Sequence, residues 1–521
     1  MQTFTISPDT PFTPMSELVR EHARQRPAHA ALTDEGETLS YAQLDALMDR
    51  IAAALQQGGV QPGQAVAVCA LNSARYAALF LGVLRAGAVV APLAPSSTAE
   101  SLASMLRDAD AHLLFIDKAA LELAPQAAGA PRCISLDGVA RGLAFEDWLA
   151  PEGAKPAPVQ VKPEAPFNII YSSGTTGTPK GIVQSHGMRW AHIQRGLRYG
   201  YGPGTATLLA TPLYSNTTLV AVLPTLTLGG TLVLMPKFNA AKFLKLAERL
   251  RATHAMLVPV QYQRLLDAPE FDQTDLSTLT TRFCTSAPFK ADLKAEVLRR
   301  WPGKLTEYYG MTEGGVGCQL ECHNHPDKLH TVGKPRDTTL VLMIDDEGKP
   351  VPRGELGEIV GHSAAMMNGY YRLPEKSAEV EWFDDQGRRY IRTGDVGRFD
   401  EDGFIVLGDR TKDMIISGGF NIYPQDIEAE LVQNPEVREC SVFGVPSREW
   451  GETPGAYVVA RDPARHPAEL AEEVKAWLNS RVGKTQRVSD LIVVDSLPRS
   501  EIGKVLKRDL REQYQQRGVA V

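Results

Sequence analysis

The stretch that decides the interpretation of this chain is Tyr171-Ser172-Ser173-Gly174-Thr175-Thr176-Gly177-Thr178-Pro179-Lys180-Gly181. It follows the apolar run 167–170, which predicts a buried strand. Glycines let a backbone turn and approach a ligand closely, and consecutive N–H groups in such a turn form a concave donor surface for an anion. The hydroxyl groups add donors, and Lys180 adds a compact positive charge. The stretch therefore predicts a loop that binds a polyphosphate.

The loop differs from a Walker A loop, which requires the pattern G-x4-G-K-[ST]. Here Lys180 follows Pro179, and the nearest preceding glycine is Gly177. A flexible Gly/Ser/Thr linker is the alternative interpretation. A linker needs neither a lysine nor a buried strand before it, so a phosphate loop of another class is favoured.

Length and composition restrict the class of protein. A chain of 521 residues with 43% hydrophobic and 22% charged residues predicts a globular protein of two or more domains. The net charge of −7 argues against a nucleic-acid binder. The six cysteines show no disulfide-framework spacing, which predicts reduced thiols and a cytoplasmic location. No signal peptide is indicated, and no apolar run reaches the roughly 20 residues of a membrane span.

Cysteines and histidines crowd together once, at Cys318, Cys322, His323 and His325. The spacing C-x3-C-H-x-H is not a standard zinc arrangement, and no second ligand pair follows nearby. A metal site at these residues is therefore disfavoured.

Apolar segments alternate with helical patterns on both sides of the loop, which is typical of parallel α/β sheets. Before the loop we expect helices within 15–57, strand 66–70, helix 74–86, strand 87–93, helix 101–109 and strand 112–116. After it we expect strand 207–211, helix 219–228, strand 231–235, helix 240–252, strand 255–258, helix 292–301 and strand 305–308. Short strands and Gly/Asp turns over 333–409 predict a β-rich subdomain, and the last ~110 residues predict a small domain of mixed strands and helices.

A second motif, Tyr309-Gly310-Met311-Thr312-Glu313, follows a predicted strand. Gly310 allows close approach to a planar ligand on which Tyr309 stacks, Thr312 offers a hydroxyl to a phosphate, and Glu313 offers an oxygen suited to Mg²⁺. Alone this motif is weak, because Thr-Glu at the start of a helix is common capping chemistry.

Three further motifs lie toward the C-terminus. Asp395, behind a Thr-Gly turn, is suited to accept both hydroxyls of a ribose, although an Asx-type turn is the simpler interpretation. The segment 408–424 falls where the composition changes, so a few of its residues can absorb a domain rotation. In 498–504, Lys504 follows Gly503 directly.

These five motifs, in this order, resemble those of the AMP-forming adenylating enzymes: acyl-CoA synthetases, luciferases and peptide-synthetase adenylation domains. The early segments 39–44 and 84–88 resemble the same family, so the resemblance covers nearly the whole chain. It implies an α/β fold with a large N-terminal domain (1–409) of stacked α/β sheets and a β-rich subdomain. A hinge (410–413) with Lys412 and a small mobile α+β C-terminal domain (414–521) follow.

The resemblance also implies the roles of individual residues. Lys504 bridges the substrate carboxylate and the α-phosphate, Glu313 holds Mg²⁺, and Lys412 is the hinge. The ATP and AMP contacts are Ser172, Ser173, Gly174, Thr175, Thr176, Gly177, Thr178, Lys180, Tyr309, Gly310, Met311, Thr312, Asp395 and Arg410. The coenzyme A contacts are Ser417, Gly418 and Gly419. The catalytic set comprises Lys504, Thr312, Glu313 and Lys180.

The acyl pocket implied by the resemblance contains Tyr214, Ser215, Asn216, Ser286, Ala287, Pro288 and Gly310. Ser215 stands where most acyl- and aryl-CoA ligases have a histidine. Asn216 stands where amino-acid-activating relatives have an aspartate, which disfavours an amino acid as substrate. Either Asn216 contacts a ring hydroxyl of an aromatic acid, or it caps a helix that begins at Thr217.

The predicted function is an acyl-CoA synthetase that uses ATP, Mg²⁺ and coenzyme A to activate an aromatic or a medium- or long-chain fatty acid. The alternatives are a stand-alone enzyme that loads a carrier protein and, from another class, a non-catalytic nucleotide-binding protein. The sequence leaves the acid and the oligomeric state open, with a homodimer as one option.

Overall fold

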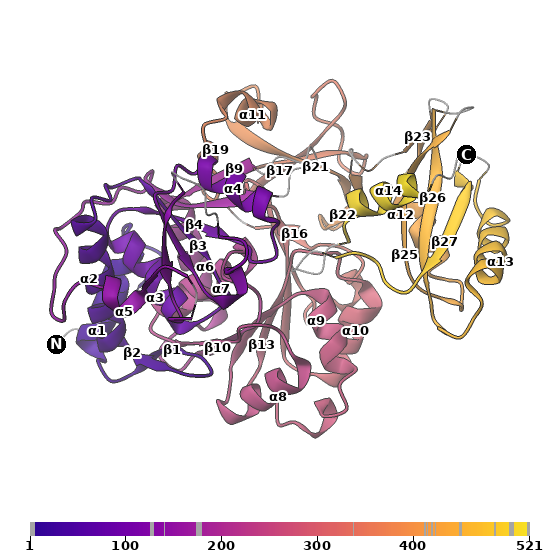
Figure 1. Cartoon of the computed structure of the whole chain (residues 1–521). Coiled ribbons are helices and arrows are strands. Elements are labelled where there is room, and N and C mark those ends of the chain that lie inside the picture. Colours follow the sequence, from indigo (N-terminus) through magenta and orange to yellow (C-terminus); the bar gives the residue numbers. More distant parts are fainter. Residues whose placement is uncertain are drawn as a thin grey trace. The chain divides into compact units, whose positions relative to one another are not determined.

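The computed structural model describes residues 6–517 apart from 125–129, 140, 173–179, 337, 411–412, 414, 418–419, 423, 448–450, 484–485 and 500–504. The chain forms two compact units (Figure 1). Unit 1 comprises residues 1–340 and 361–391, and unit 2 comprises residues 341–360 and 392–521. The predicted boundary at residue 409 stays a prediction.

Two large sheets form the body of unit 1. The eight-stranded sheet has the order β19-β9-β8-β4-β3-β5-β6-β7 and the nine-stranded sheet has the order β16-β15-β14-β13-β12-β10-β11-β1-β2. The strands of the first sheet are β3 (Ala65–Cys69), β4 (Val89–Leu93), β5 (Leu113–Ile116), β6 (Arg132–Ser135), β7 (Leu143–Ala144), β8 (Pro166–Ser172), β9 (Lys180–Ser185) and β19 (Gly369–Tyr370). Those of the second are β1 (Ala30–Thr33), β2 (Thr38–Ser40), β10 (Ala206–Leu209), β11 (Thr231–Leu234), β12 (His254–Leu257), β13 (Thr281–Cys284), β14 (Lys304–Gly310), β15 (Gly317–Glu321) and β16 (Lys334–Pro335).

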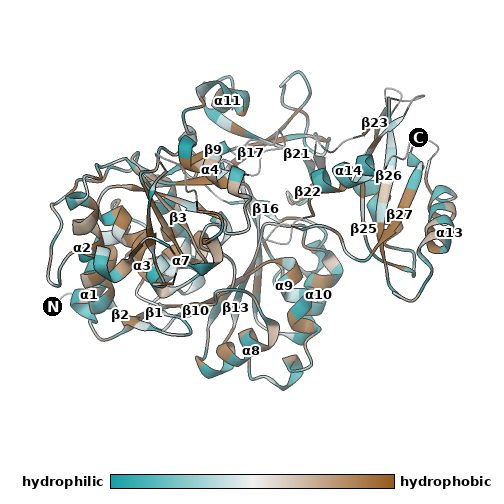
Figure 2. Ribbon diagram, viewed as in Figure 1, coloured by the Kyte–Doolittle hydropathy of each residue, from teal (hydrophilic) through white to brown (hydrophobic). Residues whose placement is uncertain are grey.

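Unit 1 also contains α-helices. They are α1 (Met15–Gln25), α2 (Tyr41–Gln57), α3 (Ala74–Arg85), α4 (Ala99–Asp108), α5 (Phe145–Trp148), α6 (His186–Gly196), α7 (Asn216–Thr227), α8 (Ala240–Arg249), α9 (Pro259–Leu266), α10 (Ala291–Arg300) and α11 (Pro374–Glu379). Helices α1, α2, α3 and α7 share one apolar core with strands of both sheets, and Figure 2 colours much of α3 as hydrophobic. This α/β architecture confirms the predicted fold class.

Most predicted elements of unit 1 are present, with ends that differ by a few residues. Local chemistry explains several starts: α2 begins with a capping box between Ser40 and Gln43, and Ser185 caps α6 by accepting a hydrogen bond from the Met188 N–H. The elements absent from the predictions are mainly β1, β9, α6, α9 and β13.

Unit 2 has its own core beneath a sheet of the order β24-β23-β26-β25, with β27 paired to β26. Its elements are β23 (Ile415–Ser417), β24 (Phe420–Ile422), α12 (Pro424–Leu431), β25 (Val437–Ser447), β26 (Gly451–Ala460), α13 (Pro467–Asn479), β27 (Asp490–Val494) and α14 (Lys507–Gln516).

A further sheet has the order β17-β18-β21-β20, with β22 paired to β21. Its strands are β17 (Leu340–Ile344), β18 (Gly357–His362), β20 (Glu381–Phe383), β21 (Arg389–Phe399) and β22 (Ile405–Arg410), and they confirm the predicted β-rich segment.

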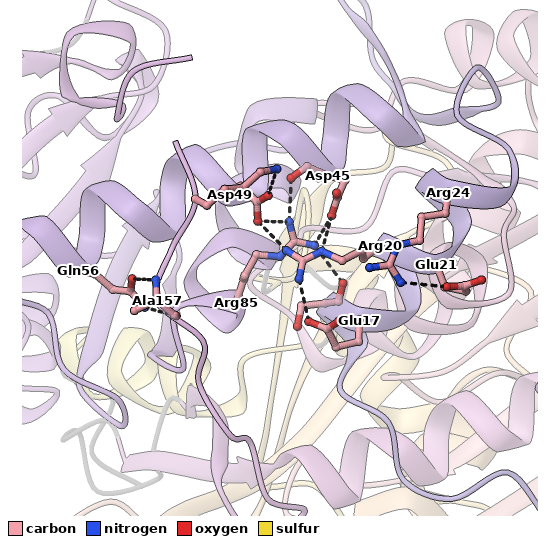
Figure 3. A network of polar contacts seen from close by, with 11 residues as sticks. Glu17, Arg20, Glu21, Arg24, Asp45, Asp49, Gln56, Arg85 and Ala157 are labelled. Atoms are coloured by element: carbon pink, nitrogen blue, oxygen red, sulfur yellow. Dashed lines mark hydrogen bonds and ion pairs between the residues drawn. The ribbon is translucent and has the colours of Figure 1, made fainter. Parts of the chain in front are cut away.

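A buried ionic network joins the first three helices of unit 1 (Figure 3). The Arg85 guanidinium, of which 3% of the side chain is exposed, donates to Asp45 at 2.5 Å and to Asp49 at 2.9 Å. Asp49 also accepts from Arg20 and from Lys155, each at 2.7 Å. Each buried charge in this network therefore has a partner of opposite sign.

No helix in the described part of the chain is long and apolar enough to cross a membrane.

Candidate functional site

The predicted phosphate loop joins two antiparallel strands of unit 1. Strand β8 ends at Ser172 and β9 begins at Lys180, and these two residues are register partners. The buried strand predicted before the loop is confirmed, since Phe167 and Ile169 are almost completely buried in β8. The predicted contacts Ser173, Gly174, Thr175, Thr176, Gly177 and Thr178 lie outside the described residues, as does the side chain of Ser172.

At the end of this hairpin, Lys180 and Glu313 both contact Tyr370, the lysine at the ring and the glutamate at the hydroxyl group. The Lys180 Nζ lies 5.1 Å from the centroid of the Tyr370 ring. The Tyr370 hydroxyl donates a hydrogen bond of 2.9 Å to Glu313 Oε1. Burial, together with the neighbouring Glu313 carboxylate, raises the pKa of Tyr370, so the phenol keeps the proton that it donates. Two residues that the sequence analysis assigned to the nucleotide site are thus brought together.

Sequence reasoning missed Tyr370. It lies in the two-residue strand β19, which pairs with β9 at the other edge from β8. A strand this short carries no periodic pattern. The only signal was a pair of tyrosines after Gly369 within a segment of turns.

The Thr312-Glu313 motif is followed by a turn in which two glycines have positive φ, 77° at Gly314 and 79° at Gly315. A Cβ atom at Gly314 would lie 1.9 Å from the Ala365 carbonyl oxygen, so only glycine fits. The Thr312 carbonyl accepts a 2.6 Å hydrogen bond from the Gln184 side chain of β9. The turn is thereby fixed to the same strand that begins with Lys180.

The predicted acyl-pocket residues Ser215 and Asn216 lie at the start of α7. The helix begins at Asn216, and Ser215 occupies the N-cap position without a side-chain capping bond. Asn216 Oδ1 accepts a hydrogen bond of 2.8 Å from the Arg189 guanidinium. The interpretation of Asn216 as a helix cap is therefore wrong, because the residue lies inside the helix and its amide oxygen faces α6.

The segment Ser286-Ala287-Pro288 follows β13 and approaches the same helix. Ser286 has a φ of 79°, which is rare for a residue other than glycine and stores backbone strain. Its hydroxyl is hydrogen-bonded to the Thr217 hydroxyl of α7. Strain of this kind persists where the surrounding contacts fix it, as is common at binding sites. Tyr214 is half-buried just before α7.

Tyr309 and Gly310 end strand β14. Tyr309 is half-buried, and a Cβ atom at Gly310 would lie 2.9 Å from the Val316 carbonyl oxygen, so a larger residue would displace the neighbouring chain. The preceding residue, Tyr308, stacks on Phe283 with ring centroids 5.5 Å apart. Met311 packs with the apolar cluster around Ile182.

A second group that sequence reasoning missed is the buried polar network around Arg189, of which 1% is exposed. Its Nε and Nη2 donate to Asn168 Oδ1 at 3.2 and 2.9 Å, and Nη2 also donates to Gln184 Oε1. Together with the bond to Asn216, these contacts link this predicted acyl-pocket residue to Thr312 through Gln184. Burial, with a further effect of Arg195, lowers the pKa of Arg189 to about 9.

The predicted ribose contact Asp395 lies in unit 2. Asp395 of β21 and Arg410 of β22 are register partners. The turn before Asp395 is fixed by Thr393, whose hydroxyl donates to the Ile359 carbonyl and accepts from the Asp395 N–H. The side chains of Arg410 and Ser417 lie outside the described residues, as do Lys412, Gly418, Gly419 and Lys504.

The cysteine–histidine cluster is built into the nine-stranded sheet. Cys318 and Cys322 are buried free thiols, and burial raises the pKa of each to about 12. His323 Nδ1 lies 3.1 Å from the Leu305 carbonyl oxygen. Among the residues that the structure describes, no group of three or more His, Cys, Asp or Glu side chains is arranged to hold a metal ion.

Comparison with known proteins identifies the family. The AMP-binding enzyme model matches residues 19–371, and the AMP-binding enzyme C-terminal domain matches residues 426–504. The chain is 34% identical over 504 residues to a feruloyl-CoA synthase of Amycolatopsis sp, covering 94% of this chain and 97% of that protein. It is 32% identical over 503 residues to the fatty acid–acyl-carrier-protein ligase ScoC of Streptomyces coeruleorubidus, covering 95% of each.

Among solved structures, ATP-bound MatB from Rhodopseudomonas palustris matches with a TM-score of 0.83 at 31% identity, covering 96% of this chain and 99% of that one. The family matches and the structural likeness cover the large body and the small C-terminal domain alike. The chain therefore belongs to the AMP-binding enzymes and is an adenylate-forming ligase.

Proposed function

We propose that this chain is an AMP-forming carboxylate–CoA ligase. In the first half-reaction, the carboxylate of an acid attacks the α-phosphate of ATP, which forms an acyl-adenylate and releases pyrophosphate. In the second, the thiol of coenzyme A attacks the acyl carbon, which forms the thioester and releases AMP. The observation that carries the proposal is the placement of Lys180, Tyr370 and Glu313 beside the phosphate-loop hairpin, within a chain whose relatives include a feruloyl-CoA synthase.

The geometry around Glu313 fits a magnesium ion. Oε1 accepts from Tyr370, whereas Oε2 has no hydrogen-bond partner among the described residues, which leaves one hard oxygen available to a metal ion. Mg²⁺ is usually bound by one or two carboxylates plus substrate phosphates. Bound there, the ion would offset negative charge on the phosphates. Lys180 would add a second positive charge at the same place.

Lys504 is proposed as the cation that meets the two anions of the first half-reaction. A carboxylate and a phosphate repel each other as they approach, so a positioned ammonium lowers the barrier more than it favours binding of the substrates. The phosphate loop, in contrast, holds the pyrophosphate that leaves. The substitution Lys504→Ala separates these roles.

We expect Lys504→Ala to lower the rate of acyl-adenylate formation by about 10²–10³-fold, as removal of a charge-stabilising donor does. Thioester formation from supplied acyl-adenylate should be largely retained. The first rate is measured by acid-dependent pyrophosphate release and the second by loss of the coenzyme A thiol. Lys507→Ala is the matched control, because Lys507 begins the nearby helix α14 and pairs with Glu428 at 3.1 Å. Normal adenylate formation by Lys504→Ala would contradict the assignment.

A carrier-protein ligase is the second candidate, favoured by the likeness to ScoC. Both enzymes release pyrophosphate when supplied with the correct acid. They differ in the thiol acceptor, so the acid panel is run with coenzyme A, with a phosphopantetheinylated carrier protein and with neither. Acyl transfer to free coenzyme A supports the proposed function, and transfer to the carrier alone overturns it.

A further inference from the structure

Three arginines and a histidine gather on one side of the acyl-pocket residues. Helix α6 carries Arg189, His192 and Arg195 at intervals of three residues, which places them along one face. Arg336 follows strand β16. Arg189 Nη1 lies 3.3 Å from His192 Nδ1. Burial, followed by Arg195, Arg189 and Arg336, lowers the pKa of His192 well below its usual value, as expected for a neutral ring surrounded by cations. Arg189, Arg195 and Arg336 are called the arginine cluster below.

The arginine cluster has no acidic partner in the part of the chain that the structure describes. Arg189 donates to three side-chain amides, and Arg336 donates to the Gly317 carbonyl. Arg195 lies over the Tyr308 ring, 4.7 Å from its centroid, and its Nη2 is buried without a hydrogen-bond partner. The neighbouring acid Glu321 accepts a 2.7 Å bond from Asn324 instead. Several positive charges thus lie in or near the interior without compensation, which is costly for a protein in the absence of an anion.

Each arginine of the cluster lies close to the predicted acyl-pocket residues. Arg189 holds Asn216 at the start of α7. Arg336 lies against Gly317, where its Nη2 would be 2.0 Å from a Cβ atom, and Gly317 is the register partner of Gly310. Tyr308, beneath Arg195, is two residues before Gly310. An acid bound among the predicted acyl-pocket residues would therefore have these side chains as close neighbours.

We propose that the arginine cluster binds a second carboxylate of the acyl substrate, so that the enzyme activates a dicarboxylic acid at one end. The inference rests on the proposed function and specifies the substrate class for the same site. A guanidinium recognises a carboxylate through paired N–H donors, and Arg195 has an unused donor in the interior. A neutral alkyl or aryl chain would leave the arginine cluster without an anionic partner, whereas a second carboxylate would supply one.

The test is pyrophosphate release with aliphatic diacids from malonic to sebacic acid, the three benzenedicarboxylic acids and the monomethyl ester of each. The intact enzyme should use at least one diacid about tenfold or more better, in kcat/KM, than its monomethyl ester, since an unpaired buried charge costs the ester this much. In Arg195→Met this preference should fall toward one, mainly through loss of activity on the diacid. Arg336→Met should change it in the same direction.

Arg198→Met is the matched control, because it removes the same charge from an exposed residue just beyond α6. It should keep the preference of the unchanged protein. Equal use of diacids and esters by the unchanged protein would overturn the inference, as would an equal loss on both substrates in Arg195→Met, which would place the reacting carboxylate at the cluster.

Failure of every acid to release pyrophosphate would instead contradict the proposed function. The inference is then decided by calorimetric titration of the same diacids and esters. Tighter binding of a diacid than of its ester, weakened by Arg195→Met and unaffected by Arg198→Met, supports it. Equal binding of the two, or no binding of either, overturns it.

Discussion

Unit 1 contains two groups of buried and half-buried arginines that differ in what surrounds them. The Arg85 network between α1, α2 and α3 pairs each buried guanidinium with aspartates, as Figure 3 shows. The arginine cluster beside α6 contacts amides, a backbone carbonyl and an aromatic ring in the described part of the chain. The protein therefore supplies carboxylates for the arginines of the Arg85 network. It supplies none, among the described residues, for the arginine cluster.

The difference indicates what each group is for. A network that satisfies its own charges holds three helices together and needs no ligand. A group of like charges without acids lowers stability, and proteins retain such arrangements where function requires them. Buried arginine alone therefore does not mark a binding site. The proposed site rests instead on the unused donor of Arg195 beside residues of the predicted pocket.

The largest effect is expected when the compensated network is broken. Arg85→Met leaves Asp45 and Asp49 with one buried partner fewer and should lower the free energy of unfolding by about 3–5 kcal/mol. Urea unfolding followed by circular dichroism measures the change. The control is Arg24→Met, an exposed arginine paired with Glu21, which should alter stability by no more than about 0.5 kcal/mol. Similar values for the two variants would show that the network is not structural.

A smaller effect on the free energy of unfolding is expected when the pH is lowered. Burial alone raises the pKa of Asp49, but the Lys155 hydrogen bond and the charges of Arg85 and Arg20 outweigh it, so the pKa is lowered from 3.8. A carboxylate with a lowered pKa contributes stability above its unfolded pKa, and this contribution is lost as the pH falls through the folded value. The free energy of unfolding of the unchanged protein should therefore exceed that of Asp49→Asn by a constant amount above about pH 3.8. The excess should decrease below that pH.

Urea unfolding of both proteins across this range measures the excess. An excess that grows as the pH falls would contradict the paired role of Asp49.

Much of the fold could be predicted because its signals are local. The helix Ala74–Arg85 and the strand Thr231–Leu234 follow from apolar patterns and turn residues, and the structure places them almost where they were expected. Helix α6 was missed because it mixes glycine, histidine, tryptophan and arginine, and the sequence pattern does not show that Arg189 is buried. The burial of Arg189 depends on Asn216 of α7 and on Asn168 of β8, which lie elsewhere in the sequence.

The site was predicted unevenly for the same reason. Lys180, Thr312 and Glu313 stand in compact motifs whose spacing indicates phosphate and metal chemistry. Tyr370 and Gln184, which connect these motifs, act through contacts between strands that are distant in sequence. Asn216 shows the limit most clearly, since the sequence allowed a cap and the structure turns its amide toward Arg189.

The most direct measurement is the heat unfolding of the unchanged protein and of Arg195→Met, each with and without a saturating diacid chosen from the panel. Without ligand, Arg195→Met should be as stable as the unchanged protein or more stable, in contrast to Arg85→Met, because an uncompensated charge is removed. The diacid should raise the melting temperature of the unchanged protein, as binding to the folded state requires, and have little effect on Arg195→Met. Equal stabilisation of the two proteins by the diacid would contradict the account.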